Sequence, residues 1–186
     1  MVSDDQIILG CKKGKRRAYS QLYEKYAAVL MGLCLRYTKN REEAEDVLQE
    51  GFIKIFKYID TYGAKGSFEG WMKRIMVNTA INYYKKNKKL RMEEALDVNN
   101  ARHVGTGSVG AEDTQDVPQE VLLAHINDLP AGYRLVFNMF VFEGLTHREI
   151  AGELDISEGT SKSQLAKARR QLRTRLEKYI EQYQKA

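Results

Sequence analysis

The chain has 186 residues, of which 43% are hydrophobic and 30% charged, and its formal net charge is +5. This length allows one large domain or two small ones, and the apolar content is sufficient for real cores. The longest apolar run, residues 27–35, is too short to span a bilayer, and the polar N-terminus is unlike a signal peptide, so we expect a cytoplasmic protein without membrane insertion.

The basic residues are concentrated in two blocks that are separated by an acidic one. Residues 73–91 hold seven lysines and arginines and no acid, and residues 162–178 hold seven more against one acid. Residues 93–116 reverse the sign, with six acids against one arginine. This distribution predicts two separate anion-facing surfaces.

The first half of the chain is predicted to be helical. Residues 19–37 carry apolar side chains three or four positions apart, and a second such pattern follows a helix start near Asn40. Residues 61–67 contain two glycines and predict a loop. Helix resumes at Phe68 and is expected to end near Leu90.

The second half begins with a change of composition. Residues 97–117 contain three glycines and many polar side chains without periodicity, which indicates a flexible linker. Helix is then expected in four segments, at about 118–128, 130–143, 147–154 and 158–183.

No segment alternates with a period of two, so the predicted fold class is all-α. We expect two small helical domains joined by a flexible linker, with a helix-turn-helix in the second. The predicted boundaries are 1–92 for the first domain, 93–117 for the acidic linker and 118–186 for the second domain.

The segment from residue 146 onward predicts the helix-turn-helix. Thr146 and Glu149 have the spacing of a capping box at the start of a short helix, and Ser157 is placed to cap the next one. The later helix begins with small polar residues and then carries the second basic block. A short helix, a tight turn and a longer helix of this kind are typical of proteins that read duplex DNA.

A helical wheel of residues 158–183 separates an apolar stripe from a basic face. The stripe falls within an arc of about 80° and is expected to form the core: Leu165, Ala168, Leu172, Leu176, Tyr179 and Tyr183. Lys162, Ser163, Gln164 and Lys167 are able to reach base edges in a major groove. A solvated charged face is the alternative interpretation.

The helix that begins at Phe68 carries a second polar stripe. Asparagine is unfavourable inside helices, so two of them beside three cations suggest hydrogen bonds to bases or to a nucleic-acid backbone. Trp71 falls on the same side, where it could stack on an unpaired base; packing at a domain edge is the alternative. The stripe covers about 80° and consists of Arg74, Asn78, Asn82, Lys85 and Lys89.

Residues 42–59 are amphipathic, but their exposed face mixes acidic and apolar side chains. Asp46, Gln49, Glu50 and Ile53 fall together on that face. A solvated face usually mixes lysine with glutamate, so this composition indicates a docking surface for a basic patch on another protein.

Three segments in this order resemble the sigma-70 family of bacterial RNA polymerase sigma factors. They read AEDVLQEGFIKIFKYID, SFEGWMKRIMVNTAINYYKK and LPAGYRLVFNMFVFEGLTHREIAGELDISEGTSKSQLAKARRQLR. The chain looks most like the extracytoplasmic-function subgroup, which keeps only the second and fourth sigma regions, and the resemblance covers nearly everything except the linker. It implies a protein that binds core polymerase and directs promoter recognition, DNA melting and transcription initiation.

The resemblance implies three sets of site residues. Binding to the coiled coil of the polymerase β′ subunit is implied for Asp46, Gln49, Glu50, Phe52 and Ile53. Recognition and opening of the −10 element are implied for Tyr62, Phe68, Trp71, Arg74, Asn78, Asn82, Lys85, Lys86 and Lys89, with the loop from Tyr62 to Phe68 capturing a flipped non-template base. Recognition of the −35 element is implied for Thr146, Ser157, Thr160, Lys162, Ser163, Gln164, Lys167, Arg170 and Arg173.

The same resemblance implies partners: the polymerase β flap, promoter DNA that is duplex at −35 and single-stranded at −10, and an anti-sigma protein. The linker would thread toward the polymerase active-site cleft, although a solvated tether explains its acidity equally well. Positions 162, 164 and 167, often arginine in this family, are Lys, Gln and Lys here. Glutamine is suited to adenine, so the −35 sequence of a relative does not transfer simply.

Two other classes of protein fit the sequence less well. A two-domain regulator that binds operator DNA without polymerase would explain residues 144–175 but not the acidic docking surface or the asparagine stripe. An enzyme is not expected, because the sequence has no phosphate-binding glycine loop and no credible nucleophile with a base. His103, His125 and His147 share no ligand spacing and are expected on the surface, and the two cysteines are isolated, so no metal or cofactor is predicted.

Overall fold

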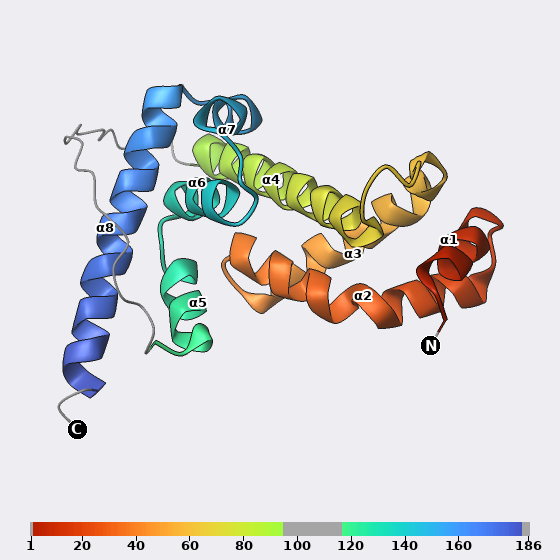
Figure 1. Cartoon of the computed structure of the whole chain (residues 1–186). Coiled ribbons are helices and arrows are strands. Elements are labelled where there is room, and N and C mark those ends of the chain that lie inside the picture. Colours follow the sequence, from red (N-terminus) through yellow and green to blue (C-terminus); the bar gives the residue numbers. More distant parts are fainter. Residues whose placement is uncertain (1, 95–116, 184–186) are drawn as a thin grey trace. The chain divides into compact units, whose positions relative to one another are not determined.

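The computed structural model describes the backbone of residues 2–94 and 117–183, and the side chains of 2–87 and 117–183 (Figure 1). These residues form α-helices and one short 3-10 helix, with no strand among them. They divide into two compact units, Met1–Lys86 and Asn87–Ala186. The predicted all-α class is therefore confirmed, whereas most of the predicted linker, 93–117, lies outside the described residues.

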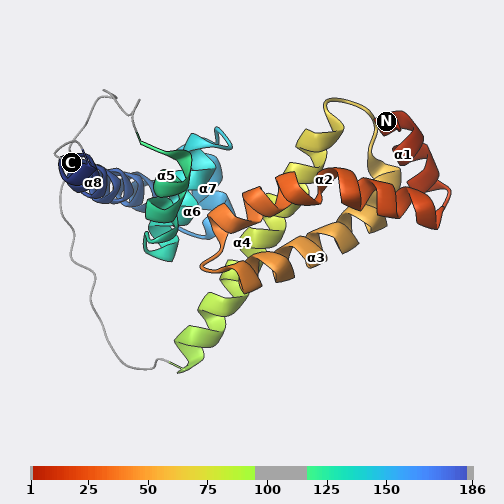
Figure 2. The same ribbon diagram turned by 90° about the horizontal axis from the view of Figure 1, so that it is seen from below.

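The first unit contains α1 (Asp4–Lys12), α2 (Arg16–Tyr37), α3 (Arg41–Tyr58), the 3-10 helix η1 (Ile59–Thr61) and α4 (Phe68–Glu94), which continues past the unit boundary. Both α1 and α3 pack against α2, and α3 runs beside it in Figures 1 and 2. The predicted start near Asn40 is confirmed, because the Asn40 side chain accepts a hydrogen bond from the Glu43 amide at 2.8 Å. The loop between η1 and α4 was also predicted.

The core of this unit is built where the helices face one another. Leu22 and Leu30 on α2, Ile55 on α3 and Met72 on α4 are all fully enclosed. Gly51 on α3 lies so close to α4 that an added Cβ would overlap the Met76 side chain. The glycine thus leaves room for the Met76 side chain between α3 and α4.

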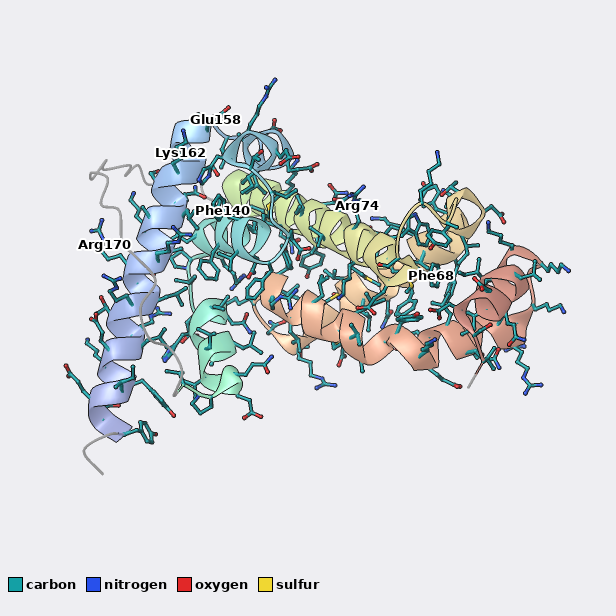
Figure 3. All side chains as sticks on the ribbon, viewed as in Figure 1. Phe68, Arg74, Phe140, Glu158, Lys162 and Arg170 are labelled. Atoms are coloured by element: carbon teal, nitrogen blue, oxygen red, sulfur yellow. The ribbon has the colours of Figure 1, made fainter. Side chains whose placement is uncertain are left out.

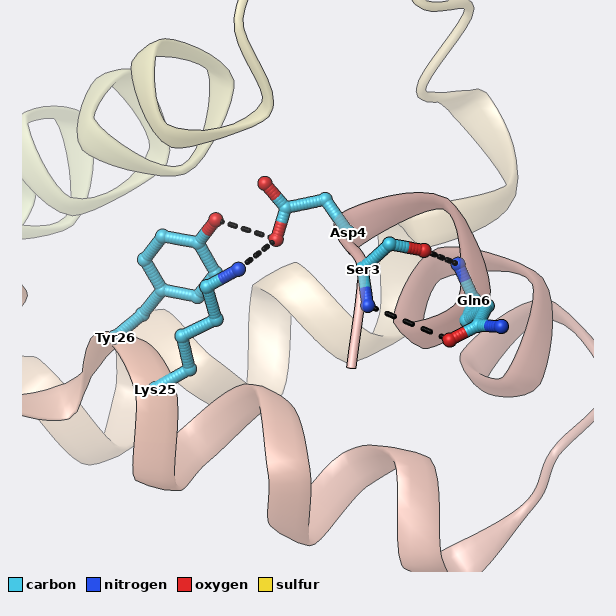
Figure 4. A network of polar contacts seen from close by, with 5 residues as sticks. All are labelled: Ser3, Asp4, Gln6, Lys25 and Tyr26. Carbon is cyan, nitrogen blue, oxygen red and sulfur yellow. Dashed lines mark hydrogen bonds and ion pairs between the residues drawn. The ribbon is translucent and has the colours of Figure 1, made fainter. Parts of the chain in front are cut away.

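A partly buried polar network holds α1 against α2 (Figure 4). Asp4 accepts hydrogen bonds from the Lys25 ammonium at 2.7 Å and from the Tyr26 hydroxyl at 2.8 Å. Ser3 and Gln6 form a capping box at the start of α1. The hydrogen bond from Lys25, more than any other contact, lowers the pKa of Asp4.

The second unit contains α5 (Gln119–Asn127), α6 (Ala131–Val141), α7 (His147–Leu154) and α8 (Glu158–Tyr183). The predicted bounds of the last two helices agree with the structure, and those of the first two are one or two residues too long. Its core joins α5 and its following turn to α8 through Ile126, Leu129, Ala168 and Leu172.

The apolar stripe of α8 is shorter than predicted. The buried positions of α8 end at Leu172, and Leu176 and Tyr179 are only half-buried. Tyr183 is 66% exposed and stacks on Tyr179 with a ring separation of 4.5 Å. The periodicity continues past the last core residue, so the prediction of Tyr183 as a core residue was wrong.

Candidate functional site

The exposed face of α3 holds four of the five predicted polymerase-binding residues. Asp46, Gln49, Glu50 and Ile53 are exposed, and Ile53 leaves 67% of its surface open. We call these four residues the α3 surface. A β-branched apolar side chain this exposed, beside two carboxylates, is typical of a protein-docking surface rather than of a solvated helix face.

Phe52, the fifth predicted residue, lies underneath this surface. It is only 3% exposed and packs against Tyr23 and Phe56, with ring centroids 4.7 and 5.8 Å apart. Phe52 therefore supports the α3 surface from the core and is not part of it, because its position falls on the face that α2 covers.

Glu50 is held in place by the neighbouring turn and by α4. Its carboxylate pairs with the Lys54 ammonium at 2.6 Å, and Lys54 also donates a hydrogen bond to Thr79 of α4 at 3.3 Å. A carboxylate held this way keeps a defined position on the α3 surface.

An aromatic cluster joins the loop after η1 to the start of α4. The rings of Tyr62 and Phe68 are 5.0 Å apart, those of Tyr62 and Trp71 are 5.5 Å apart, and Phe68 stacks on Trp71 at 5.8 Å. Phe68 is buried, Tyr62 and Trp71 are half-buried, and Tyr26 of α2 meets Phe68 edge-on at 5.9 Å. Trp71 thus lies at the edge of the unit and is partly accessible, which is compatible both with edge packing and with stacking on a base.

The loop between η1 and α4 is closed by its own hydrogen bonds. The Tyr62 hydroxyl donates to the Gly66 carbonyl at 2.7 Å, and the Lys12 ammonium of α1 donates to the Tyr62 carbonyl at 3.1 Å. Ala64 adopts a left-handed conformation with φ 55°, which is uncommon for a residue other than glycine. These contacts give the loop a definite shape beside Trp71.

The polar stripe of α4 is accessible. Arg74, Asn78 and Asn82 are exposed, Lys86 is exposed and Lys85 is half-buried; Figure 3 shows Arg74 and Phe68 along this helix. The side chain of Lys89 lies outside the described residues. Both asparagine side chains therefore lie outside the protein core. Inside the core, an asparagine within a helix would serve packing rather than binding.

The helix-turn-helix is built from the caps that its sequence predicts. Thr146 accepts a hydrogen bond from the Glu149 amide at 3.3 Å, and the Glu149 carboxylate accepts one from the Thr146 amide at 2.8 Å. The hydrogen bond from the Thr146 hydroxyl is the main reason that the pKa of Glu149 is lowered. Asp155 ends α7 in a left-handed conformation, and Ser157 accepts from the Thr160 amide at 3.0 Å to begin α8.

The predicted base-contacting residues of α8 divide into two groups. Lys162, Arg170 and Arg173 are exposed, and Figure 3 shows the first two along α8. Ser163, Gln164 and Lys167 are half-buried: the Gln164 amide lies over Gly132 of α6, and the Lys167 ammonium lies 6.0 Å from the Tyr133 ring. Contact of Gln164 or Lys167 with a base therefore requires these side chains to leave α6.

A buried polar contact that the sequence did not suggest holds the helix-turn-helix together. His147 Nδ1 lies 2.9 Å from the hydroxyl of Ser161, which is fully enclosed on α8, and the His147 ring stacks on Phe140 of α6 at 4.8 Å. Burial lowers the pKa of His147, and the charge of Lys162 adds to the effect. His147 is half-buried, so it lies at the surface as expected but is held there by α6 and α8, which the sequence did not suggest.

The other histidines and the cysteines add no further site. His125 is half-buried, its carbonyl accepts a hydrogen bond from Arg175 at 3.1 Å, and His103 lies outside the described residues. Cys11 and Cys34 are buried and free, and burial raises their pKa values to about 11 and about 12. Within residues 2–94 and 117–183, no group of side chains is arranged to hold a metal ion and no helix is long and apolar enough to cross a membrane.

Comparison with known families matches both halves of the chain. Residues 22–90 match the family Sigma-70 region 2, and residues 119–172 match the family Sigma-70, region 4. The first match contains the α3 surface, the aromatic cluster and the α4 stripe, and the second contains the helix-turn-helix through Leu172.

Individual relatives cover nearly the whole chain. The ECF RNA polymerase sigma-E factor of Haemophilus influenzae is 26% identical over 185 residues, which are 95% of this chain and 96% of the relative. The RNA polymerase sigma-H factor of Pseudomonas aeruginosa is 27% identical over 175 residues, 89% of this chain and 90% of the relative. The fold is similar to that of the sigma factor RpoE from Bartonella quintana, solved with the anti-sigma factor NepR, with a TM-score of 0.50, 19% identity and coverage of 86% and 96%.

Proposed function

The chain belongs to the extracytoplasmic-function subgroup of the sigma-70 family, and from this membership we propose how its residues perform the work of a sigma factor. Such a protein binds core RNA polymerase and directs it to promoters, where DNA is recognised, melted and transcribed. The observation that carries this function is the presence of both sigma regions, in order, in one chain. What each surface does is the proposal.

The α3 surface docks on the coiled coil of the polymerase β′ subunit. Asp46 and Glu50 supply negative charge for basic residues on the partner, and the exposed Ile53 supplies apolar contact at the centre. The second unit contacts the β flap. Docking on both the β′ coiled coil and the β flap allows the two DNA-binding surfaces to contact the promoter at the same time.

The helix-turn-helix binds the −35 element as duplex. Lys162, Arg170 and Arg173 are exposed on α8 and contact phosphates or base edges. Thr146, Ser157 and Thr160 lie at the starts of α7 and α8 and contact the DNA backbone. Ser163 completes the reading surface, together with Gln164 and Lys167 once these two side chains leave α6. Phosphate contacts supply register and salt-dependent affinity, and base-edge contacts supply sequence preference.

The first unit binds the −10 element as separated strands. The loop from Tyr62 to Phe68 captures a flipped non-template base beside Trp71, and the stripe of Arg74, Asn78, Asn82, Lys85, Lys86 and Lys89 follows the strand along α4. Each stacked base contributes about 1–3 kcal/mol. This offsets the loss of a few base-pair steps at about 1.4 kcal/mol each, so melting becomes favourable once the complex has formed.

The two readers are joined as 1–92 and 118–186 by the acidic segment 93–117. Tethering raises the effective concentration of the second contact after the first has formed, so neither reader needs high affinity alone. The protein performs no covalent chemistry itself, acts in the bacterial cytoplasm on the nucleoid, and is held inactive by an anti-sigma protein until it is released.

The test of this function is transcription by sigma-free core polymerase with the purified chain, on a genomic library of promoters. We expect defined start sites that depend on the chain. A regulator that binds operator DNA without polymerase would give no such start sites and would not co-purify with core enzyme in stoichiometric amounts.

The docking assignment has its own test. Asp46→Arg together with Glu50→Arg is expected to abolish co-purification with core enzyme while helicity is retained, because both charges of the α3 surface are reversed. Glu24→Arg together with Glu181→Arg, two exposed acids elsewhere, makes the same change in net charge and is expected to bind normally. Retained binding by the first variant would remove the α3 surface from the interface.

A further inference from the structure

A third basic surface lies at the turn between α1 and α2. Residues 12–17 include only one residue without positive charge, Gly14, whose φ of 66° makes the turn. We call the cationic residues of this segment the basic turn: Lys12, Lys13, Lys15, Arg16 and Arg17. All five are exposed.

Among the described residues, none neutralises the basic turn. Some cations elsewhere in the first unit pair with acids, as Lys25 does with Asp4, Arg41 with Glu45 and Lys73 with Glu69. Within the described part of the chain, no residue of the basic turn forms such a pair.

Lys12 is favourably placed in the last turn of α1, but the other end of the basic turn opposes helix stability. Lys15, Arg16 and Arg17 stand at the start of α2, which has no side-chain cap and no acid in its first turn. Cations near a helix N-terminus are unfavourable, and α1, α3 and α7 begin with caps and acids instead. Residues that oppose the local preferences of a helix without stabilising the fold are expected where function requires them.

The basic turn is attached to the loop that precedes α4. The Lys12 ammonium donates to the Tyr62 carbonyl at 3.1 Å, α1 packs on η1, and Figures 1 and 2 both show α1 beside this segment. The network of Asp4, Lys25 and Tyr26 (Figure 4) holds α1 in that position. The Tyr26 ring also meets Phe68 edge-on. The basic turn is therefore a fixed neighbour of the aromatic cluster.

We propose that the basic turn binds the phosphates of the separated non-template strand on the far side of the captured base from α4. The α4 stripe and the basic turn flank the loop, so a strand whose base enters the loop has cations on both sides. Lysine and arginine at these positions contact the backbone without reading sequence, which sets the register of the captured base. This inference rests on the proposed base capture by the loop.

The experiment measures binding of holoenzyme, made from core polymerase and the full chain, to single-stranded non-template oligonucleotides. All contain the −10 element, and they are extended on its 5′ side, on its 3′ side or on neither. We expect Arg16→Gln with Arg17→Gln to weaken binding to only one of the extended strands. For that strand, the slope of log affinity against log salt should fall by about 0.7 for each lost phosphate contact, or about 1.4 for two.

A matched control is Lys39→Gln with Arg41→Gln, which removes the same charge at the opposite end of α2, about 30 Å away by helix rise. This control should bind all strands normally. Arg74→Gln on α4 should weaken the strand extended on the other side.

Three results would overturn the inference: equal loss on both extensions, no loss on either, or loss of core binding, which would assign the basic turn to an acidic polymerase surface. Failure of the proposed function is recognised separately. In that case the unaltered chain with core enzyme binds no −10 strand, whatever its extension.

Discussion

Asp155 determines the direction of the turn between the two helices of the DNA-reading motif. It adopts φ 56° and ψ 48°, and its amide donates to the Ala151 carbonyl at the end of α7. Aspartate enters this left-handed region more easily than most residues because its short polar side chain can form local hydrogen bonds. The position therefore restricts which residues keep α7 and α8 at their present angle.

We predict that Asp155→Val destabilises the second unit by about 1–2 kcal/mol, because a β-branched residue is strained in this conformation. Hydrogen exchange of the α7 and α8 amides in the full chain is the measurement, and exchange should accelerate in the variant. Asp155→Gly and Asp155→Asn should exchange like the unaltered chain. Equal protection in the valine variant would show that the turn relaxes without cost.

His147 makes the same unit sensitive to pH. Its pKa is lowered from the ordinary 6.5, first by burial and then by Lys162 and Arg169, while Glu158 opposes the shift. The unfolded chain therefore binds a proton at His147 more tightly than the folded unit does. The stability of the unit is therefore greatest above pH 6.5 and falls as the pH drops below that value.

We predict that lowering the pH from about 7.5 to about 5.5 reduces the protection of the α7 and α8 amides. Protection here is measured from the exchange rate corrected for the intrinsic effect of pH on amide exchange. In His147→Gln, which keeps a hydrogen-bonding group near Ser161 but cannot titrate, this additional loss should disappear. A loss of the same size in both chains would assign the pH dependence to other groups.

At the scale of the element, caps made the helix boundaries predictable. Thr146, Ser157 and Asn40 bond the first-turn amides as the sequence suggests, because a cap depends only on residues three positions apart. The periodicity likewise gave the all-α class and the position of the α3 surface.

Burial at the ends and edges of helices could not be predicted in this way. Gln164 lies next to exposed positions on its wheel, yet α6 contacts it. Phe52 falls in the apolar pattern of its helix, as its burial agrees, and only the resemblance implied that it contacts a partner. The basic turn and the contact between His147 and Ser161 were missed for the same reason, because each depends on a contact with a residue distant in sequence. Tertiary packing, which a single wheel does not contain, decides these cases.

The contact between α3 and α4 gives a prediction for the first unit. A Cβ at Gly51 would overlap the Met76 side chain, which is fully enclosed and cannot move into solvent. We expect Gly51→Ala to destabilise the unit by about 1–3 kcal/mol through overpacking, although alanine is the better helix former. Urea unfolding followed by Trp71 fluorescence reports on this unit.

Gly32 on α2 is the matched control, because an added Cβ there meets no atom within 4 Å. Gly32→Ala is expected to stabilise the unit by up to about 1 kcal/mol. Adding Met76→Ala to Gly51→Ala should cost less than the two single changes together, since it removes the overlap. Additive costs would contradict the proposed crowding of α3 and α4.

At the scale of the whole molecule, the division of labour predicts that the two DNA contacts fail differently. The first unit offers accessible asparagines and a half-buried tryptophan, which suit unpaired bases, while the second offers capped helices and exposed cations, which suit duplex. A defect in the first unit should therefore be repaired by DNA that is already open. A defect in the second should not.

We predict that Trp71→Ala with Asn82→Ala lowers the open fraction of a duplex promoter about tenfold or more, because stacking on one base contributes about 1–3 kcal/mol and 1.4 kcal/mol is tenfold. At saturating holoenzyme, a pre-melted promoter needs no such contribution to open, so its transcription should be largely retained. Permanganate footprinting measures the first quantity and run-off transcription the second. Lys162→Ala is the control and should weaken binding to both templates equally, since both keep the −35 duplex. If the Trp71 and Asn82 variant instead lost equally on both templates, those residues would act in binding rather than in melting.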